Sequence, residues 1–142
     1  NLSGPLPTFY HRLSSQKPCF VVDTRRDFIF IDDLVDVVLM ALDGKGQKGV
    51  YHISSGSDFS IKELFDATII AMEHTLSHDV EVRPRSPDDV YTILLDPTKT
   101  NQDFGWRTST PLGKGVRLAV EWYKRFGVSQ TFTHLKGKAA KA

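Results

Sequence analysis

Short runs of β-forming residues alternate along this chain with segments whose apolar residues recur at helical spacing. Cys19 to Val22 is an apolar run bounded by a proline and an aspartate, and Arg26 to Ile31 is a second run rich in β-branched and aromatic residues. Leu34 to Leu42 and Ile61 to Met72 instead place their apolar residues three and four positions apart. The alternation predicts an α/β fold rather than a β-sandwich or a helical bundle.

Several helix starts and ends are marked by the residues around them. Residues 6–13 predict a short first helix that ends before a Lys-Pro pair. Asp32 or Asp33 is expected to cap the next helix through its carboxylate. Ser60 and Glu63 have the spacing of a capping box and mark the clearest helix start in the chain.

Prolines and glycines bound the last two predicted helices. Pro97 is expected at the first position of one helix, which Gly105 ends. Pro111 opens the last helix, which Gly127 ends. Short strands are also predicted between helices, at residues 50–53 and 79–82.

Size and charge limit the classes of protein that the chain can belong to. A chain of 142 residues, 40% of them hydrophobic, can bury one domain-sized core. Its formal net charge of +1 gives no strong field toward nucleic acid or a membrane, and no apolar run approaches the ~20 residues of a spanning helix. Lysines without acidic residues gather in 128–142. We therefore expect a folded domain over 1–127 and a disordered basic tail over 128–142.

The start of the chain and its single cysteine bear on where the protein works. Cys19 cannot form an internal disulfide, and no signal peptide precedes the first predicted helix, which favours a cytoplasmic protein. The chain opens at Asn1 without an initiator methionine, so we expect a segment of a longer protein.

Catalytic and metal-binding motifs are sparse. No tyrosine is followed four residues later by a lysine, so a Tyr-x-x-x-Lys acid/base pair is absent. The glycine-rich segment Gly44 to Gly49 lies between a predicted helix and a predicted strand, the reverse of the order in a dinucleotide fingerprint. His74 and His78 could share a helix face, but no third ligand clusters with them, so we interpret them as a surface helix end. We assign no catalytic, cofactor-binding or metal-binding residue.

Two arginines are candidates for binding an anion. Arg26 begins a predicted strand, and Arg85 lies in an irregular, proline-broken loop. A guanidinium group offers planar two-point hydrogen bonding to phosphate oxygens. The alternative is that both are surface arginines paired with the nearby Asp27 and Asp88.

The segment around Arg26 carries a family resemblance. Arg26-Asp27-Phe28-Ile29-Phe30-Ile31-Asp32-Asp33 resembles the Arg-Asp-Phe-Ile-x-Val-Asp-Asp motif of the extended short-chain dehydrogenases/reductases, which are NAD-dependent nucleotide-sugar epimerases and dehydratases. Further segments resemble other motifs of that family in the same order: Asn1-x-x-Gly4-Pro5, Gly49 to Gly56, Ser60-x-x-Glu63-Leu64, Arg85-Ser86-Pro87-Asp88, Asp96 to Trp106 and Leu112 to Tyr123.

The resemblance implies the C-terminal portion of a Rossmann-type fold, including the smaller substrate-binding subdomain. It implies that Arg26 and Arg85 bind the substrate diphosphate, that Asp88 holds the nucleotide ribose, and that Asn1 approaches the diphosphate and sugar. NAD and the Thr/Ser-Tyr-Lys catalytic group would belong to an upstream half. The chain departs from the family pattern at His52 and at Ser86-Pro87, and it has no glycine hairpin before Arg26, so the resemblance carries no preference for a base.

The implied reaction is epimerisation of a nucleotide sugar through a 4-keto intermediate formed by hydride transfer to NAD. Three reactions of the same family are alternatives: 4,6-dehydration, decarboxylation and reduction. A non-catalytic binding module with the same fold is another. The implied partners are a nucleotide-diphosphate sugar and an NAD-binding half, with a homodimer allowed for the whole protein. Neither nucleic acid nor a membrane is expected as a partner.

Overall fold

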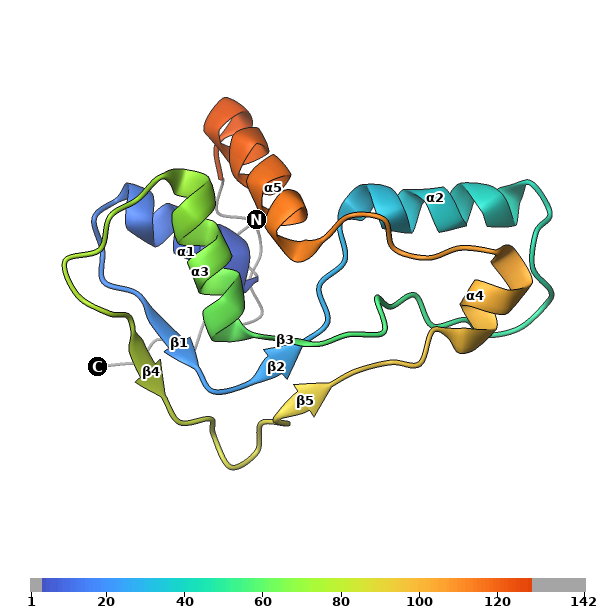
Figure 1. Cartoon of the computed structure of the whole chain (residues 1–142), viewed down its shortest axis with the longest axis horizontal. Coiled ribbons are helices and arrows are strands. Elements are labelled where there is room, and N and C mark those ends of the chain that lie inside the picture. The colour runs from blue at the N-terminus through green and yellow to red at the C-terminus, as the bar shows by residue number, and fades with distance from the viewer. Residues whose placement is uncertain (1–3, 129–142) are drawn as a thin grey trace, which may run out of the picture.

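Helices and short strands follow one another in the computed structural model, which describes residues 4–128 (Figure 1). The helices are α1 (Pro5–Ser14), α2 (Ile31–Leu42), α3 (Ile61–Met72), α4 (Thr98–Phe104) and α5 (Leu112–Phe126). The strands are β1 (Phe20–Val22), β2 (Arg25–Arg26), β3 (Phe59–Ser60), β4 (Glu81–Arg83) and β5 (Thr92–Ile93). The prediction of an α/β fold is confirmed. No helix within 4–128 is long and apolar enough to cross a membrane.

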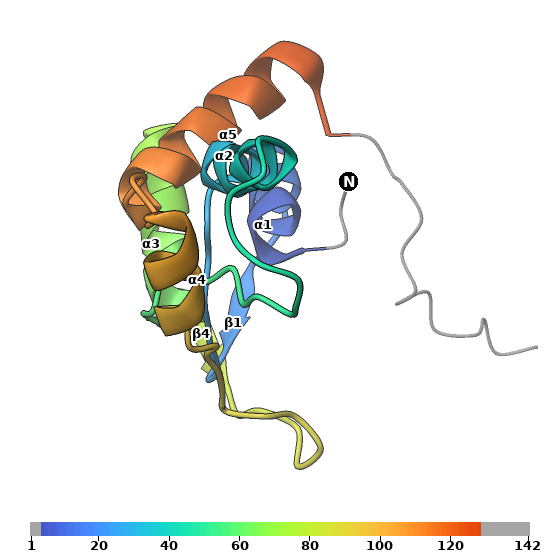
Figure 2. The ribbon, with the colours of Figure 1, turned by 90° about the vertical axis from the view of Figure 1, so that its right-hand side faces the viewer.

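The strands form two small sheets, one of β1 and β4 below α1 and α3 and one of β2, β3 and β5 nearer the centre (Figure 1). β1 pairs in parallel with β4, so that Val21 stands beside Val82. β2 lies between β3, to which it is antiparallel, and β5, to which it is parallel. The parallel register places Arg26 beside Ile93. The segment between β4 and β5 protrudes from the body of the molecule in both views (Figures 1 and 2).

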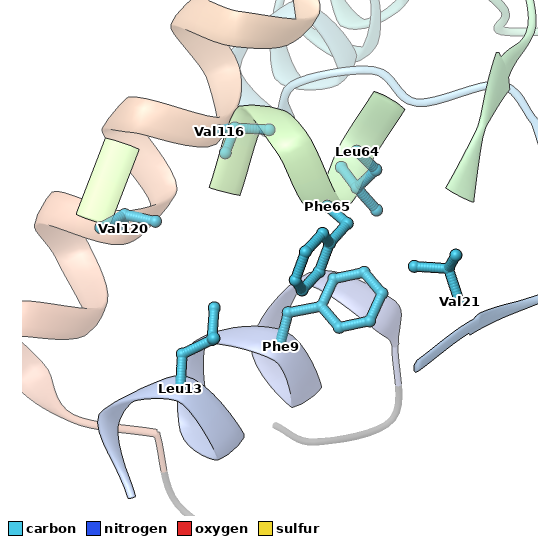
Figure 3. Packing of buried hydrophobic residues seen from close by; sticks show 7 residues of the cluster. All are labelled: Phe9, Leu13, Val21, Leu64, Phe65, Val116 and Val120. Carbon is cyan, nitrogen blue, oxygen red and sulfur yellow. The ribbon is translucent and has the colours of Figure 1, made fainter. Parts of the chain in front are cut away.

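The main hydrophobic core lies where α1, α3 and α5 meet β1. Its buried residues are Phe9, Leu13, Val21, Leu64, Phe65, Val116 and Val120 (Figure 3). The rings of Phe9 and Phe65 meet edge to face with centroids 5.1 Å apart. The start of α3 is fixed as predicted, because Ser60 accepts from the Glu63 amide and the Glu63 carboxylate accepts from the Ser60 amide.

A smaller core lies at the other end of the molecule, between α2 and α4 (Figure 1). Val37, Phe104 and Trp106 are its buried residues. A Cβ added at Gly46 would lie 2.3 Å from the Phe104 ring, so only glycine fits there. The loop that follows α2 is therefore shaped by packing against α4.

Four local predictions were wrong. Asp33 does not cap α2. Phe30 occupies the N-cap without a side-chain bond, and the buried Asp33 carboxylate instead accepts from residues 109 and 110. Pro97 precedes α4 as its N-cap rather than forming its first residue. Residues 50–53 form no strand, and the second strand is limited to Arg25–Arg26, because a strand needs a hydrogen-bonded neighbour and these residues find none within 4–128.

Candidate anion-binding site

Arg26 ends β2, and its guanidinium group turns back onto the segment that leads into β5. Its Nη1 donates to three backbone carbonyls: Arg25 at 2.7 Å, Val90 at 2.9 Å and Tyr91 at 3.2 Å. Its Nη2 donates to Oδ1 of Asp89 at 2.8 Å. The side chain stays 26% exposed.

The neighbouring arginine of β2 is used differently. The Nε of Arg25 lies 3.1 Å from Oδ1 of Asp58, and its Nη1 lies 3.6 Å from Oε2 of Glu63. The hydrogen bond that Arg25 donates to the Asp58 carboxylate raises the pKa of Arg25 above its ordinary value. Arg25 thus joins β2 to the start of α3, whereas Arg26 lines a groove.

Arg85 contacts the same residue as Arg26, but at its backbone rather than its side chain. Its Nη1 donates to the backbone carbonyl of Asp89 at 3.0 Å, and its guanidinium group lies over the Tyr91 ring, 5.9 Å from the centroid. The Asp89 amide donates to the Ser86 carbonyl at 3.0 Å, which closes a turn. Both predicted anion-binding arginines therefore converge on Asp89.

A groove of about 620 Å³ opens beside Arg26. It combines two arginines and one carboxylate with apolar walls from α1, β1 and the start of α3. The lining residues are Gly4, Pro5, Thr8, Phe9, Arg12, Phe20, Val22, Thr24, Arg26, Phe28, Ile61 and Asp89. A concave surface with an apolar wall and a few cations is suited to a ligand that has both a phosphate and a less polar part.

The other predicted site residues lie outside this lining. Arg85 and Asp88 are exposed on the protruding segment between β4 and β5, and Asn1 lies outside the described residues. The alternative ion pairs have different partners from those predicted. Asp27 accepts from the amide and hydroxyl of Ser55 at 2.8 and 2.6 Å, and Arg26 pairs with Asp89. Sequence reasoning missed Asp89, although the adjacent acidic pair at 88 and 89 was its signal.

The glycine-rich segment does not fit a dinucleotide. Gly44 to Gly49 has the Gly-x-Gly-x-x-Gly spacing, but it follows the C-terminal end of α2 and leads to an extended segment. A fingerprint needs these glycines between a strand and the N-terminus of a helix, where the pyrophosphate meets free amides. The Phe104 ring fills the space beside Gly46. The described residues therefore offer no cradle for NAD at this loop.

Comparisons with known proteins agree with the motif order. The family model described as GDP-mannose 4,6 dehydratase matches residues 12–119. The crystal structure of the Bordetella bronchiseptica enzyme WbmH in complex with NAD+ is 49% identical, with a TM-score of 0.83 over 90% of this chain and 42% of that one. The structure of WbmG from the same organism, in complex with NAD and UDP, is 37% identical, with a TM-score of 0.84 over 93% of this chain and 43% of that one.

A curated relative extends the similarity to an epimerase. A putative UDP-glucose 4-epimerase from Methanocaldococcus jannaschii is 32% identical over 117 residues, which are 79% of this chain and 36% of the relative. The chain thus spans well under half the length of the proteins that it matches. The family model covers most of the chain, and the fold agrees over 90% of it. The chain belongs to the family of NAD-dependent sugar-nucleotide epimerases and dehydratases, the extended short-chain dehydrogenases/reductases.

Proposed function

We propose that this chain is the C-terminal, nucleotide-sugar-binding part of an NAD-dependent nucleotide-sugar epimerase, and that Arg26 and Arg85 bind the substrate diphosphate. The observation that carries the proposal is the convergence of the two guanidinium groups on Asp89 beside the groove. Arg26 donates to the Asp89 carboxylate and Arg85 to the backbone carbonyl of the same residue, and two cations gathered at one residue are suited to an anion with two phosphates. In this proposal Asp88 meets the ribose, and Asn1 approaches the diphosphate and sugar.

The work of these residues is binding and orientation. A diphosphate held by two arginines fixes the attached sugar relative to a reacting group, which lowers the entropic part of the barrier. When bound, NAD supplies hydride transfer, and the organic chemistry belongs to the cofactor. Because the Gly44 to Gly49 loop does not fit a dinucleotide, we assign no hydride or proton step to the residues of this chain.

A face of α2 supports a second part of the proposal, that an NAD-binding half packs against this chain. The exposed apolar residues of α2 recur at one helical face: Ile31, Val35, Val38, Leu39 and Leu42. Val50, in the unpaired extended segment after α2, is 81% exposed. A helix that is apolar on its covered face and again on its open face is typical of an element buried on two sides.

A titration tests the binding proposal. UDP, dTDP and GDP sugars would be titrated calorimetrically into the folded chain, then into Arg26→Ala and Arg85→Ala. We expect each substitution to weaken binding about tenfold, the scale of a lost charge-assisted hydrogen bond. Arg107→Ala is the matched control, because Arg107 is an exposed arginine in another loop.

The result that opposes the proposal is binding that both site substitutions leave unchanged. If the folded chain binds no nucleotide sugar, the titration is repeated with the N-terminal half of WbmH supplied as the NAD-binding half. Binding that appears only then supports a site completed by both halves. Binding absent in both cases favours a non-catalytic module with this fold.

A further inference from the structure

The guanidinium group of Arg26 has two edges with different partners. Nη1 donates only to the backbone, at the carbonyls of Arg25, Val90 and Tyr91. Nη2 holds an anion, because its acceptor is the Asp89 carboxylate at 2.8 Å. The backbone contacts fix the guanidinium group in place whether or not the carboxylate is present. Arg26 is therefore preorganised for an anion at Nη2.

The backbone of Asp89 is held independently of its side chain. Its amide donates to the Ser86 carbonyl, and its own carbonyl accepts from Arg85 Nη1, both at 3.0 Å. The side chain is 39% exposed and lines the groove. Rotation about its side-chain torsions can therefore remove the carboxylate from Arg26 while the turn around residue 89 keeps its shape.

We infer that the Asp89 carboxylate occupies the place at Arg26 that a ligand phosphate takes, and that the ligand must displace it. The inference rests on the proposed function, since it concerns the same anion site. Carboxylate and phosphate oxygens bind guanidinium donors with the same planar geometry, so a phosphate that takes the Nη2 N–H facing Asp89 must replace the carboxylate there. The groove beside Arg26 has room for the incoming group, and Arg12 provides a further cation in its lining.

This arrangement makes Asp89 an internal competitor. The apparent affinity for an anion equals the intrinsic affinity multiplied by the fraction of molecules in which Asp89 has left Arg26. A half-exposed ion pair of this kind stabilises the arrangement in which Asp89 is bound to Arg26 by up to about 1 kcal/mol. That free energy lowers the fraction with Asp89 released about fivefold. Removal of the Asp89 carboxylate should therefore strengthen anion binding. If Asp89 instead positioned Arg26 for the anion, the same removal would weaken binding.

The test is a titration of inorganic pyrophosphate into the 142-residue chain, followed by phosphorus NMR, which detects weak binding. Asp89→Asn and Asp89→Ser each remove the charge, and they should bind pyrophosphate about fivefold more tightly than the unchanged chain. Asp23→Asn is the matched control, because it removes an exposed carboxylate between two residues that line the same groove. Its affinity should stay within about twofold, since no direct competition is relieved.

A double variant checks that the gain acts through Arg26. In Arg26→Gln/Asp89→Asn the gain should disappear, with circular dichroism confirming that each variant is folded. Unchanged or weaker pyrophosphate binding by both Asp89 variants overturns the inference, and so does a complete lack of binding by the unchanged chain and both variants. Those outcomes leave the diphosphate proposal standing if Arg26→Ala still weakens UDP-sugar binding. The converse, a fivefold gain for pyrophosphate with no UDP-sugar binding, supports the competitor and opposes the nucleotide-sugar proposal.

Discussion

The two ends of the molecule stabilise themselves in different ways. At one end, α1, α3 and α5 enclose a core of large apolar side chains with β1 (Figure 3). At the other end, α2 and α4 share a small core, and hydrogen bonds of Asp33 add to its stability. Asp33 accepts three hydrogen bonds there, and the Trp106 indole donates to its backbone carbonyl at 3.0 Å. The first end buries seven apolar residues in one core, whereas the second buries three and leaves one face of α2 uncovered.

The largest effect should come from the apolar end. Phe65 is 1% exposed and packs edge to face on Phe9. Phe65→Ala should lower the free energy of unfolding by about 3–5 kcal/mol, because it leaves a cavity in a closed core. Urea denaturation followed by circular dichroism measures the change. Ile70→Ala on the same helix is the control, since Ile70 is 78% exposed and should change stability by less than about 0.5 kcal/mol. Equal effects of the two substitutions would show that the apolar end is not closed.

The polar end should respond to the loss of one carboxylate. Asp33→Asn leaves a donor facing the Thr110 amide, so we expect a loss of about 2 kcal/mol in the free energy of unfolding. All proteins compared would also carry Trp122→Phe. The chain has two tryptophans and Trp122 is exposed, so this change leaves Trp106 as the one source of tryptophan fluorescence. Trp106 fluorescence should then change at lower urea than circular dichroism does. Asp32→Asn, at the exposed neighbouring position, is the control. In it the fluorescence and circular dichroism transitions should coincide.

The same carboxylate gives this end a pH dependence. Burial alone would raise the pKa of Asp33, but the hydrogen bonds from Ser109 and Thr110 outweigh burial and lower it. In the unfolded chain an aspartate titrates near pH ~4. The stabilisation is therefore complete above that value and is lost as pH falls through the lower folded value. The difference in stability between the unchanged chain and Asp33→Asn should shrink over this acidic range. A difference that grows there would contradict the lowered pKa.

Local patterns predicted the apolar end better than the polar end. The capping box at Ser60 and Glu63 uses residues three apart, and it forms as expected. Asp33 instead binds residues 76 and 77 positions away, so spacing on the helix pointed to a cap that does not form. Arg26 was predicted to bind an anion, and the carboxylate that it contacts in the fold lies 63 positions away. Short-range spacing could not show that Asp89, and not Asp27, folds back onto it.

The capping box offers a smaller test at the junction between the two ends. Ser60→Ala removes the acceptor of the Glu63 amide and should cost about 1 kcal/mol in the free energy of unfolding. Ser60→Thr retains a hydroxyl and should recover most of that loss. Thermal unfolding of the three proteins at one pH makes the comparison. A similar loss for the threonine variant would indicate that packing around residue 60, rather than the cap, matters.

The smallest effect on the chain alone should come from the open face of α2. Leu39 is 52% exposed, so Leu39→Ser should change the free energy of unfolding by less than about 0.5 kcal/mol. Val37→Ser, two residues away on the covered face, should destabilise the chain clearly, because Val37 is 3% exposed. The order reverses when the N-terminal half of WbmH is added and association is measured by calorimetry. Since Leu39 lies on the face proposed to meet that half, Leu39→Ser should weaken association, and unchanged association would remove the main support for a two-sided α2.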